Sequence, residues 1–204
     1  MRMSKISSRL TRRFQSSCST SSRTVGTHSL DVIVRAYIAI NRPKSLEELG
    51  SFEGEATLQS AIERAGMAQR PDGKRYDHQR RIPEAILCIA TSRLHSVRGA
   101  LAKARDFDSL FNIVRKAISP IQGIGELTVY DTALRIGAKL QLLPSRVYLH
   151  SGTRSGARAL GLNWKAAHLE LKDCPAELQL LRPHEIEDCL CIFKERFSRH
   201  SIRR

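Results

Sequence analysis

The chain has 204 residues, enough for one folded domain with one good hydrophobic core and room for a small subdomain. It contains 34 Lys and Arg residues against 20 Asp and Glu residues, and the net charge of +14 is typical of proteins with polyanionic partners. No apolar run approaches the roughly 20 residues of a membrane-spanning helix, so we expect no membrane partner.

The first 28 residues are rich in Ser and Arg and contain no acid. Six basic residues lie there, and removing them from +14 leaves +8, so the rest of the chain is also basic. We expect a disordered basic arm, because Ser-rich runs such as residues 18–22 give no clear amphipathic helix. The alternative is a mitochondrial transit peptide. The arm implies a cytoplasmic protein, and the transit peptide implies a mitochondrial one.

The folded domain is predicted to span residues 29–204 and to begin with three helices. The first runs from Asp31 to Ile40 and ends before Pro43. Ser45-Leu-Glu-Glu48 has the form of a capping box, which opens a short second helix. The third runs from Glu55 to Ala65.

Residues 70–81 combine a turn, Pro71-Asp-Gly73, with a cluster of basic side chains and the aromatic ring of Tyr76. One hypothesis is a loop that contacts phosphates and stacks an aromatic ring on a base. The other is a solvated basic loop. The candidate phosphate contacts are Arg70, Lys74 and Arg75.

The stretch 121–128, Ile-Gln-Gly-Ile-Gly-Glu-Leu-Thr, lies between two apolar patterns of helical spacing. The upstream pattern, residues 107–118, stops at Ser119-Pro120, and the downstream pattern continues to Leu140. Two glycines around one isoleucine suit a tight connection between two helices. Gly123 and Gly125 can take positive φ, and their N–H groups can approach a phosphate with a helix N-terminus behind them. The predicted DNA contacts of this hairpin are Gly123, Ile124, Gly125 and Thr128.

The remaining chain continues the helical pattern. A helix through Ile86 and Leu94 follows Pro83, and a short one at about residues 97–103 leads into the hairpin. After the hairpin, residues 147–150 form a connector, and Ser151-Gly-Thr153 caps a helix from Arg154 to Leu160.

The C-terminal segment is predicted to end in one helix that begins at Pro183. Its apolar face consists of Ile186, Leu190, Phe193 and Phe197. Trp164 is the only tryptophan, and a role in the core is favoured over base stacking. Because continuous alternation of apolar and polar residues is absent, we expect an all-α orthogonal helical domain of about eight helices.

The hairpin and the segment after it resemble the helix-hairpin-helix superfamily of DNA glycosylases, which contains endonuclease III and the adenine glycosylases. That family has an apolar-Gly-apolar-Gly hairpin, a segment of the type Val-Asp-Thr-His, and a helix that ends in Arg-Leu-Gly-Leu. The second part reads here Val147-Tyr-Leu-His150 and then Arg158-Ala-Leu-Gly-Leu162. The resemblance covers about residues 107–162 and implies a DNA-binding, base-excision-repair type of fold. Arg154 and Arg158 join the expected phosphate contacts.

Two departures from the family pattern concern its chemistry. Leu127 stands where the bifunctional members have a catalytic lysine, and Tyr148 stands where active members have the catalytic aspartate. A leucine forms no Schiff base, and a neutral tyrosine does not stabilise an oxocarbenium-like centre as a carboxylate does. The standard glycosylase mechanism is therefore not expected here.

Asp131 and His150 are the remaining catalytic candidates. Asp131 lies four residues before Arg135, so an ion pair along one helix face is favoured over a role as the replacement carboxylate. His150 ends the connector, where it either caps and packs or faces Asp131 across a cleft.

Five cysteines, an odd number with irregular spacing, favour reduced thiols in a cytosol. Many members of the family that this chain resembles carry an iron–sulfur cluster near the C-terminus, which makes Cys174, Cys189 and Cys191, with His168 and His184, candidate ligands. The Cys-x-Cys pair lies on a predicted helix and a fourth cysteine is missing from the region, which argues against a metal or cluster. We expect no cofactor.

These observations favour a DNA-binding helix-hairpin-helix protein without the standard glycosylase chemistry. The first alternative is an active DNA repair glycosylase or lyase with atypical residues. The second is an interaction or regulatory protein of a mobile-element or defence system, in which the hairpin serves only for packing.

Overall fold

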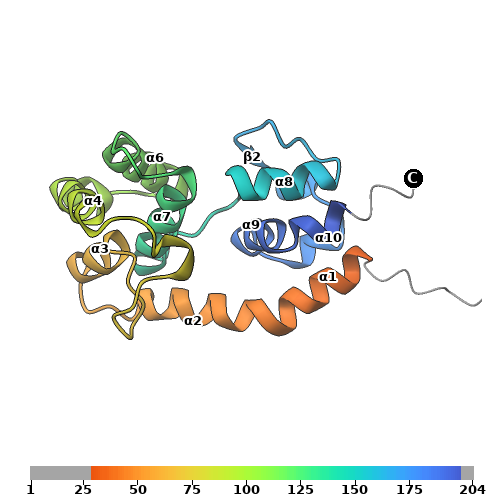
Figure 1. Ribbon diagram of the computed structural model, residues 1–204, viewed down its shortest axis with the longest axis horizontal. Helices are drawn as coiled ribbons and strands as arrows, with labels where there is room; N and C mark the ends of the chain where they lie inside the picture. The colour runs from red at the N-terminus through yellow and green to blue at the C-terminus, as the bar shows by residue number, and fades with distance from the viewer. Residues whose placement is uncertain (1–28, 199–204) are drawn as a thin grey trace, which may run out of the picture.

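The computed structural model describes residues 29–198, and these are mostly helical (Figure 1). The all-α prediction is confirmed; among the described residues, the sheet content is one pair of two-residue strands. The expected basic arm, residues 1–28, lies outside the described range, as does Cys18. In the part of the chain that is described, no helix is long and apolar enough to cross a membrane.

One long helical rod runs beneath the whole molecule in Figure 1. It consists of α1 (Leu30–Ala36), a π-helical turn (Tyr37–Asn41) and α2 (Arg42–Glu53). The predicted break before Pro43 is wrong, because this proline occupies the first turn of α2, where it continues the rod despite its missing N–H. The N–H of Arg42 instead donates to the carbonyl of Tyr37, five residues earlier.

The predicted capping box at Ser45 is also wrong, because Ser45 lies inside α2. The true capping box is found at the next helix, α3 (Leu58–Gly66). There the Thr57 hydroxyl accepts from the N–H of Ser60 at 3.0 Å, and the Ser60 hydroxyl accepts from the N–H of Thr57 at 3.2 Å. Hydroxyl side chains three apart make this cap, although the usual pattern has Glu or Gln at the second position.

The first lobe comprises α2 to α7, on the left of Figure 1. Its further elements are a 3-10 turn (Asp77–Gln79), α4 (Glu84–Ser96), α5 (Arg98–Leu101), α6 (Phe107–Ile118) and α7 (Glu126–Leu140). The predicted apolar stripe of α6 is buried, with Leu110 and Val114 inaccessible to solvent, and it packs with Phe52 and Ile136 in one core cluster. This lobe therefore fixes the position of the hairpin between α6 and α7.

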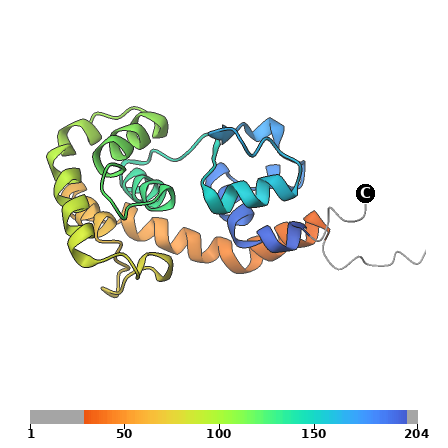
Figure 2. The same ribbon diagram turned by 45° about the horizontal axis from the view of Figure 1, so that its top comes forward.

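The second lobe comprises α1 and residues 147–198, on the right of Figures 1 and 2. Its elements are β1 (Val147–Tyr148), α8 (Ser151–Ala159), β2 (His168–Leu169), two 3-10 turns (Leu171–Asp173 and Leu178–Leu180), α9 (Pro183–Ile192) and α10 (Lys194–Ser198). The expected connector is thus partly a strand, in which Val147 pairs with Leu169 antiparallel. The predicted final helix is divided at Phe193, and all four residues of its apolar face are buried.

The two lobes have separate hydrophobic cores. In the second, Ile33 and Tyr37 of the rod pack with Ile186 and Leu190 of α9. Helices α8 and α9 approach closely at Gly156, which has no side chain. A Cβ added there would lie 2.2 Å from the carbonyl oxygen of Leu190. The single core expected from chain length is therefore divided, and the lobes are joined by the rod and by the segment between α7 and β1.

Candidate nucleic-acid interface

The predicted hairpin is present as a short connection between α6 and α7. Helix α6 ends at Ile118, and the chain turns through two backbone hydrogen bonds before α7 begins at Glu126. Gly123 has a φ of +96°, a value that favours glycine. The expectation of positive φ at Gly125 is wrong: it is the N-cap of α7 with φ −94°, and a Cβ there would meet nothing within 4 Å. The turn therefore depends on Gly123 alone for its left-handed residue.

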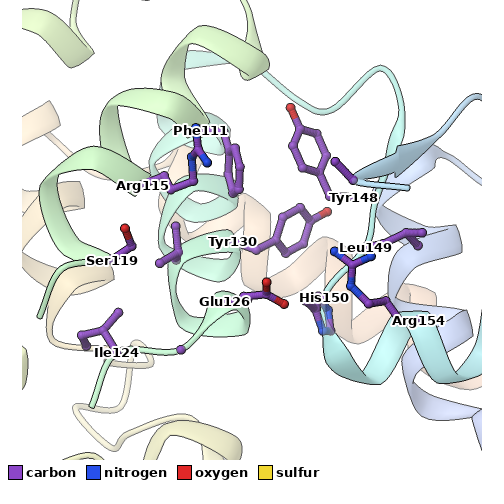
Figure 3. A pocket seen from close by; sticks show the side chains of 13 residues that line it. Phe111, Arg115, Ser119, Ile124, Glu126, Tyr130, Tyr148, Leu149, His150 and Arg154 are labelled. Carbon is purple, nitrogen blue, oxygen red and sulfur yellow. The ribbon is translucent and has the colours of Figure 1, made fainter. Parts of the chain in front are cut away.

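A cavity of about 460 Å³ lies between the hairpin and the second lobe. Figure 3 shows side chains of α6 and α7 on one side and those of β1 and α8 on the other. The hairpin contributes Ile124 and Gly125 to the wall. The other lining residues are Phe111, Arg115, Ser119, Glu126, Val129, Tyr130, Tyr148, Leu149, His150, Arg154 and Ala167. This cavity brings together residues from both halves of the resemblance; it is called the hairpin cavity below.

One corner of the hairpin cavity is built from aromatic rings. The ring of Tyr148 lies 4.7 Å from that of Phe111 and 5.8 Å from that of Tyr130, measured between centroids. Its hydroxyl donates to Asp108, which also pairs with Arg146. Burial, and then the hydrogen bond to Asp108, raise the pKa of Tyr148 above its usual value, so the phenol remains neutral. Tyr148 is thus an aromatic wall residue whose hydroxyl is already engaged.

Two buried polar atoms on residues that line this cavity have no hydrogen-bond partner among residues 29–198. They are the hydroxyl oxygen of Tyr130 and Nδ1 of His150. Tyr130 is 2% exposed and His150 is 3% exposed. Because buried polar groups are nearly always paired in folded proteins, each of these two atoms is a candidate contact for a polar ligand or a water molecule.

The other ring nitrogen of His150 has a partner. Its Nε2 contacts the carboxylate of Glu187 on α9, which also accepts from the Thr153 hydroxyl at 3.3 Å. Burial is the largest influence on Glu187 and raises its pKa, although His150 acts in the opposite direction. His150 is also the N-cap of α8, so this helix begins at Ser151 and earlier than the predicted cap at Thr153. The fully buried Thr153 instead donates a hydrogen bond from its hydroxyl to the Glu187 carboxylate.

Asp131 lies in a different cavity of about 240 Å³ between the lobes, called the acidic cavity below. Its partner is Nε2 of His78 at 2.7 Å, so the expected ion pair with Arg135 is wrong. Arg135 is buried and donates to Glu48 and to Gln79, each at 2.8 Å, with its guanidinium over the ring of Tyr76. Asp131 and Arg135 are four residues apart on α7, but each contacts a side chain from a distant part of the sequence instead of the other.

The acidic cavity also contains Glu187, Asp188 and His184 from α9. Burial, and then the neighbouring Glu187, raise the pKa of Asp188 to about 7. Burial lowers the pKa of His184 to about 4, so this imidazole is neutral at pH 7. His150 does not line this cavity and contacts Glu187, so the suggested facing pair of His150 and Asp131 is not formed.

Of the basic residues predicted to contact phosphates, Arg154 lines the hairpin cavity and the others do not. Arg154 lines the hairpin cavity, and its Nη1 donates to the carbonyl oxygens of Trp164 at 3.0 Å and Ala166 at 2.7 Å. Arg158 is exposed and lies outside the lining, with its guanidinium 5.3 Å from the ring centroid of Trp164. Trp164 is half-buried and packs against the second core. Thr128 is 8% exposed, buried in α7.

The basic segment 70–81 does not line the hairpin cavity. Arg70 and Lys74 lie 3.8 and 3.9 Å from the carboxylate of Asp72, and Arg70 lines a separate cavity beside α2. Arg75 donates to the carbonyl of Ile82 at 2.8 Å. These contacts fit the solvated loop more closely than a common footprint with the hairpin.

Two of the three cysteines described in the second lobe, Cys174 and Cys189, are buried, and Cys191 is half-buried. Burial raises the pKa of Cys174 to about 11 and that of Cys189 to about 12, so both remain protonated at pH 7. Within residues 29–198 no three His, Cys, Asp or Glu side chains are grouped so that they could hold a metal ion.

Sequence reasoning missed Phe111, Arg115 and Glu126 as residues of the site. Glu126 was detectable, since it directly follows Gly125 at the start of α7. Phe111 was read only as part of an apolar stripe, and nothing in the sequence showed that the edge of this stripe reaches a cavity.

No protein-family model matches the chain, and no curated protein or solved structure was found to be similar to it.

Proposed function

We propose that the chain is a DNA-binding protein of the helix-hairpin-helix type, related to the base-excision glycosylases. The hairpin of residues 119–125 holds the DNA backbone, and the hairpin cavity accepts one unstacked nucleotide. The observation that carries this proposal is that Ile124 and Gly125 form part of the wall of a cavity with an aromatic corner.

The hairpin has the properties of a backbone-binding turn. Gly123 and Gly125 are exposed, and Gly125 provides no side-chain cap, so the first N–H groups of α7 are free of a capping side chain. The uncapped start of this 15-residue helix favours an anion through its N–H groups and its dipole, and the Glu126 carboxylate in the first turn opposes this attraction. Arg115 and Lys116, exposed in the last turn of α6, add positive charge next to the turn.

The cavity has the properties of a site for a flat ring. Its volume falls within the roughly 300–1,000 Å³ that is usual for small-molecule pockets. Phe111 and Tyr148, both half-buried, line the cavity with aromatic rings, and any nucleobase can stack on such a ring. Glu126 in the lining repels a phosphate, so a base or sugar is the part of a nucleotide that fits.

The experiment measures the binding of the full chain to duplex DNA by fluorescence anisotropy. A 2-aminopurine placed opposite a mismatched base reports, by its own fluorescence, whether that base leaves the stack. We expect binding that weakens steeply with salt, together with increased 2-aminopurine fluorescence as the base leaves the stack. Gly123→Ala should weaken binding, because a Cβ strains the turn.

The matched control is Gly161→Ala. This glycine has a φ of +73° and, like Gly123, is exposed, but it lies in the turn after α8 and not in the hairpin. Both variants place a Cβ on a residue with positive φ. Equal loss of DNA binding in the two would show that the effect is general destabilisation, and it would remove the hairpin from the interface.

A further inference from the structure

The lining of the hairpin cavity contains two arginines and one carboxylate. Arg115 donates to the side chain of Asn112 at 3.2 Å, and Arg154 donates to two backbone carbonyls. Glu126 is exposed, and it has no ion pair with any basic side chain of the described chain. Figure 3 shows its side chain projecting from α7 toward His150 and Arg154. This carboxylate can therefore meet a ligand in the cavity without losing an ion pair.

The aromatic rings of the cavity do not distinguish one nucleobase from another. Stacking tolerates any sequence, because every base has a π-face. The hydroxyl of Tyr148 could contact the edge of a base, but it already donates to Asp108. Tyr130 and His150 are buried, so Glu126 supplies the exposed charged acceptor of the lining. Selection among stacked bases therefore depends on how their edges suit a carboxylate.

The four bases differ in the Watson–Crick edge that they present to such a group. An ionised carboxylate has two acceptor oxygens and no donor. Guanine carries two adjacent donors, N1–H and the N2 amino group, which match these oxygens. Adenine and cytosine carry an amino group beside a ring nitrogen that accepts, and thymine carries one N–H between two carbonyl oxygens. A carboxylate repels each of those acceptors, so guanine is the base whose edge it favours.

Resting on the proposed function, we propose that the hairpin cavity selects guanine and that Glu126 is the residue that determines this specificity. The guanine ring stacks on the aromatic corner formed by Phe111 and Tyr148. Both oxygens of the Glu126 carboxylate accept from the base, one from N1–H and the other from the N2 amino group. The cavity thus reads an extruded base by its hydrogen-bonding edge.

The test compares duplexes in which one base lies opposite a tetrahydrofuran abasic site, so that no base pair is broken when the base leaves the stack. The base is guanine, adenine, hypoxanthine or 1-methylguanine. Hypoxanthine lacks the N2 amino group, and 1-methylguanine lacks the N1 proton. We expect the full chain to bind the guanine duplex about tenfold more tightly than the adenine and 1-methylguanine duplexes, because a bidentate contact discriminates by about this factor. The hypoxanthine duplex should be intermediate. Fluorescence anisotropy at one fixed salt concentration measures the four affinities.

Glu126→Gln replaces one of the two acceptor oxygens by an amide that donates. It should remove the preference for guanine over adenine while retaining binding to both duplexes. Glu195→Gln is the control, since it removes the same charge from an exposed site on α10 that does not line the cavity. The control should keep the full preference.

The outcomes separate this inference from the proposed function. Equal binding of the guanine and adenine duplexes by the wild-type chain, or tighter binding of adenine, overturns the selection of guanine and leaves the proposed function standing. An unchanged preference in Glu126→Gln overturns the role of this residue. Absence of binding to all four duplexes overturns the proposed function, and the inference falls with it.

Discussion

The hairpin cavity and the acidic cavity lie between the same two lobes, but their charged groups are satisfied in different ways. In the acidic cavity each carboxylate has a partner: Glu48 has Arg135, Asp131 has His78, Glu187 has His150 and Asp188 has Tyr37. In the hairpin cavity Glu126 has no basic partner within the described chain. Tyr130 and His150 each keep an unpaired polar atom there, as His184 does at its Nδ1 in the acidic cavity, so the contrast lies in the carboxylates. A count of charged residues alone would assign chemistry to the acidic cavity. The pairing of its carboxylates indicates that the acidic cavity supports the fold, whereas the hairpin cavity contains a carboxylate without such a partner.

The largest expected effect tests whether the acidic cavity is structural. Arg135→Met removes the buried guanidinium that donates to Glu48 and Gln79, and it should lower the free energy of unfolding by about 3 kcal/mol, because breaking a buried pair leaves its partners unsatisfied. Urea denaturation measures this change. Arg158→Met, at an exposed arginine, is the control and should change stability by less than about 0.5 kcal/mol. Similar values for the two variants would contradict a structural role for Arg135.

The next effect concerns pH. The pKa of Asp188 is about 7 in the folded chain against 3.8 for a free side chain, so its contribution to stability is complete below about pH 4 and is lost as the pH rises through 7. Asp188→Asn keeps an acceptor for the Tyr37 hydroxyl and removes the charge. At pH 8 the variant should therefore be more stable than the wild-type chain by about 2 kcal/mol, with a difference that shrinks toward pH 4. Urea titrations between pH 4 and pH 8 measure it, and a difference that is constant with pH would refute the assignment.

The smallest effect compares two buried tyrosines directly. Tyr37→Phe removes a hydroxyl that donates to Asp188 and should destabilise the chain by about 1 kcal/mol. Tyr130→Phe removes a hydroxyl without a partner among the described residues and should stabilise the free protein by about the same amount. Thermal unfolding of the two variants side by side gives the sign of each change. If both variants lose stability, the hydroxyl of Tyr130 is satisfied in solution, and the contrast between the cavities weakens.

The sequence predicted the parts of the fold that local chemistry determines. The bounds of α6 followed from its apolar spacing, and the turn after it followed from Gly123. The rod was missed because Pro43 was treated as a terminator, although proline is compatible with the first turn of a helix. The two strands were missed because two residues are too short to show alternation.

The candidate site could be predicted only where neighbours in sequence remain neighbours in space. Gly125 and Ile124 are adjacent residues and both line the cavity. Asp131 was assigned to Arg135, whereas its actual partner, His78, is 53 residues away in the chain. The division of the core was equally inaccessible, because one apolar residue of a helix gives no indication of which cluster it joins.

The π-helical turn at Tyr37–Asn41 has a consequence for how the chain can vary. Each residue of an α-helix turns the chain by about 100° and advances it by about 1.5 Å, so removal of one residue from this turn would rotate α1 about the rod relative to α2. Because α1 packs in the second core and α2 in the first, that rotation would bring the two halves of the hairpin cavity out of alignment. Substitutions along the exposed face of the rod should therefore be tolerated more readily than insertions or deletions within it. The number of residues in the rod sets the alignment of the two walls of the hairpin cavity.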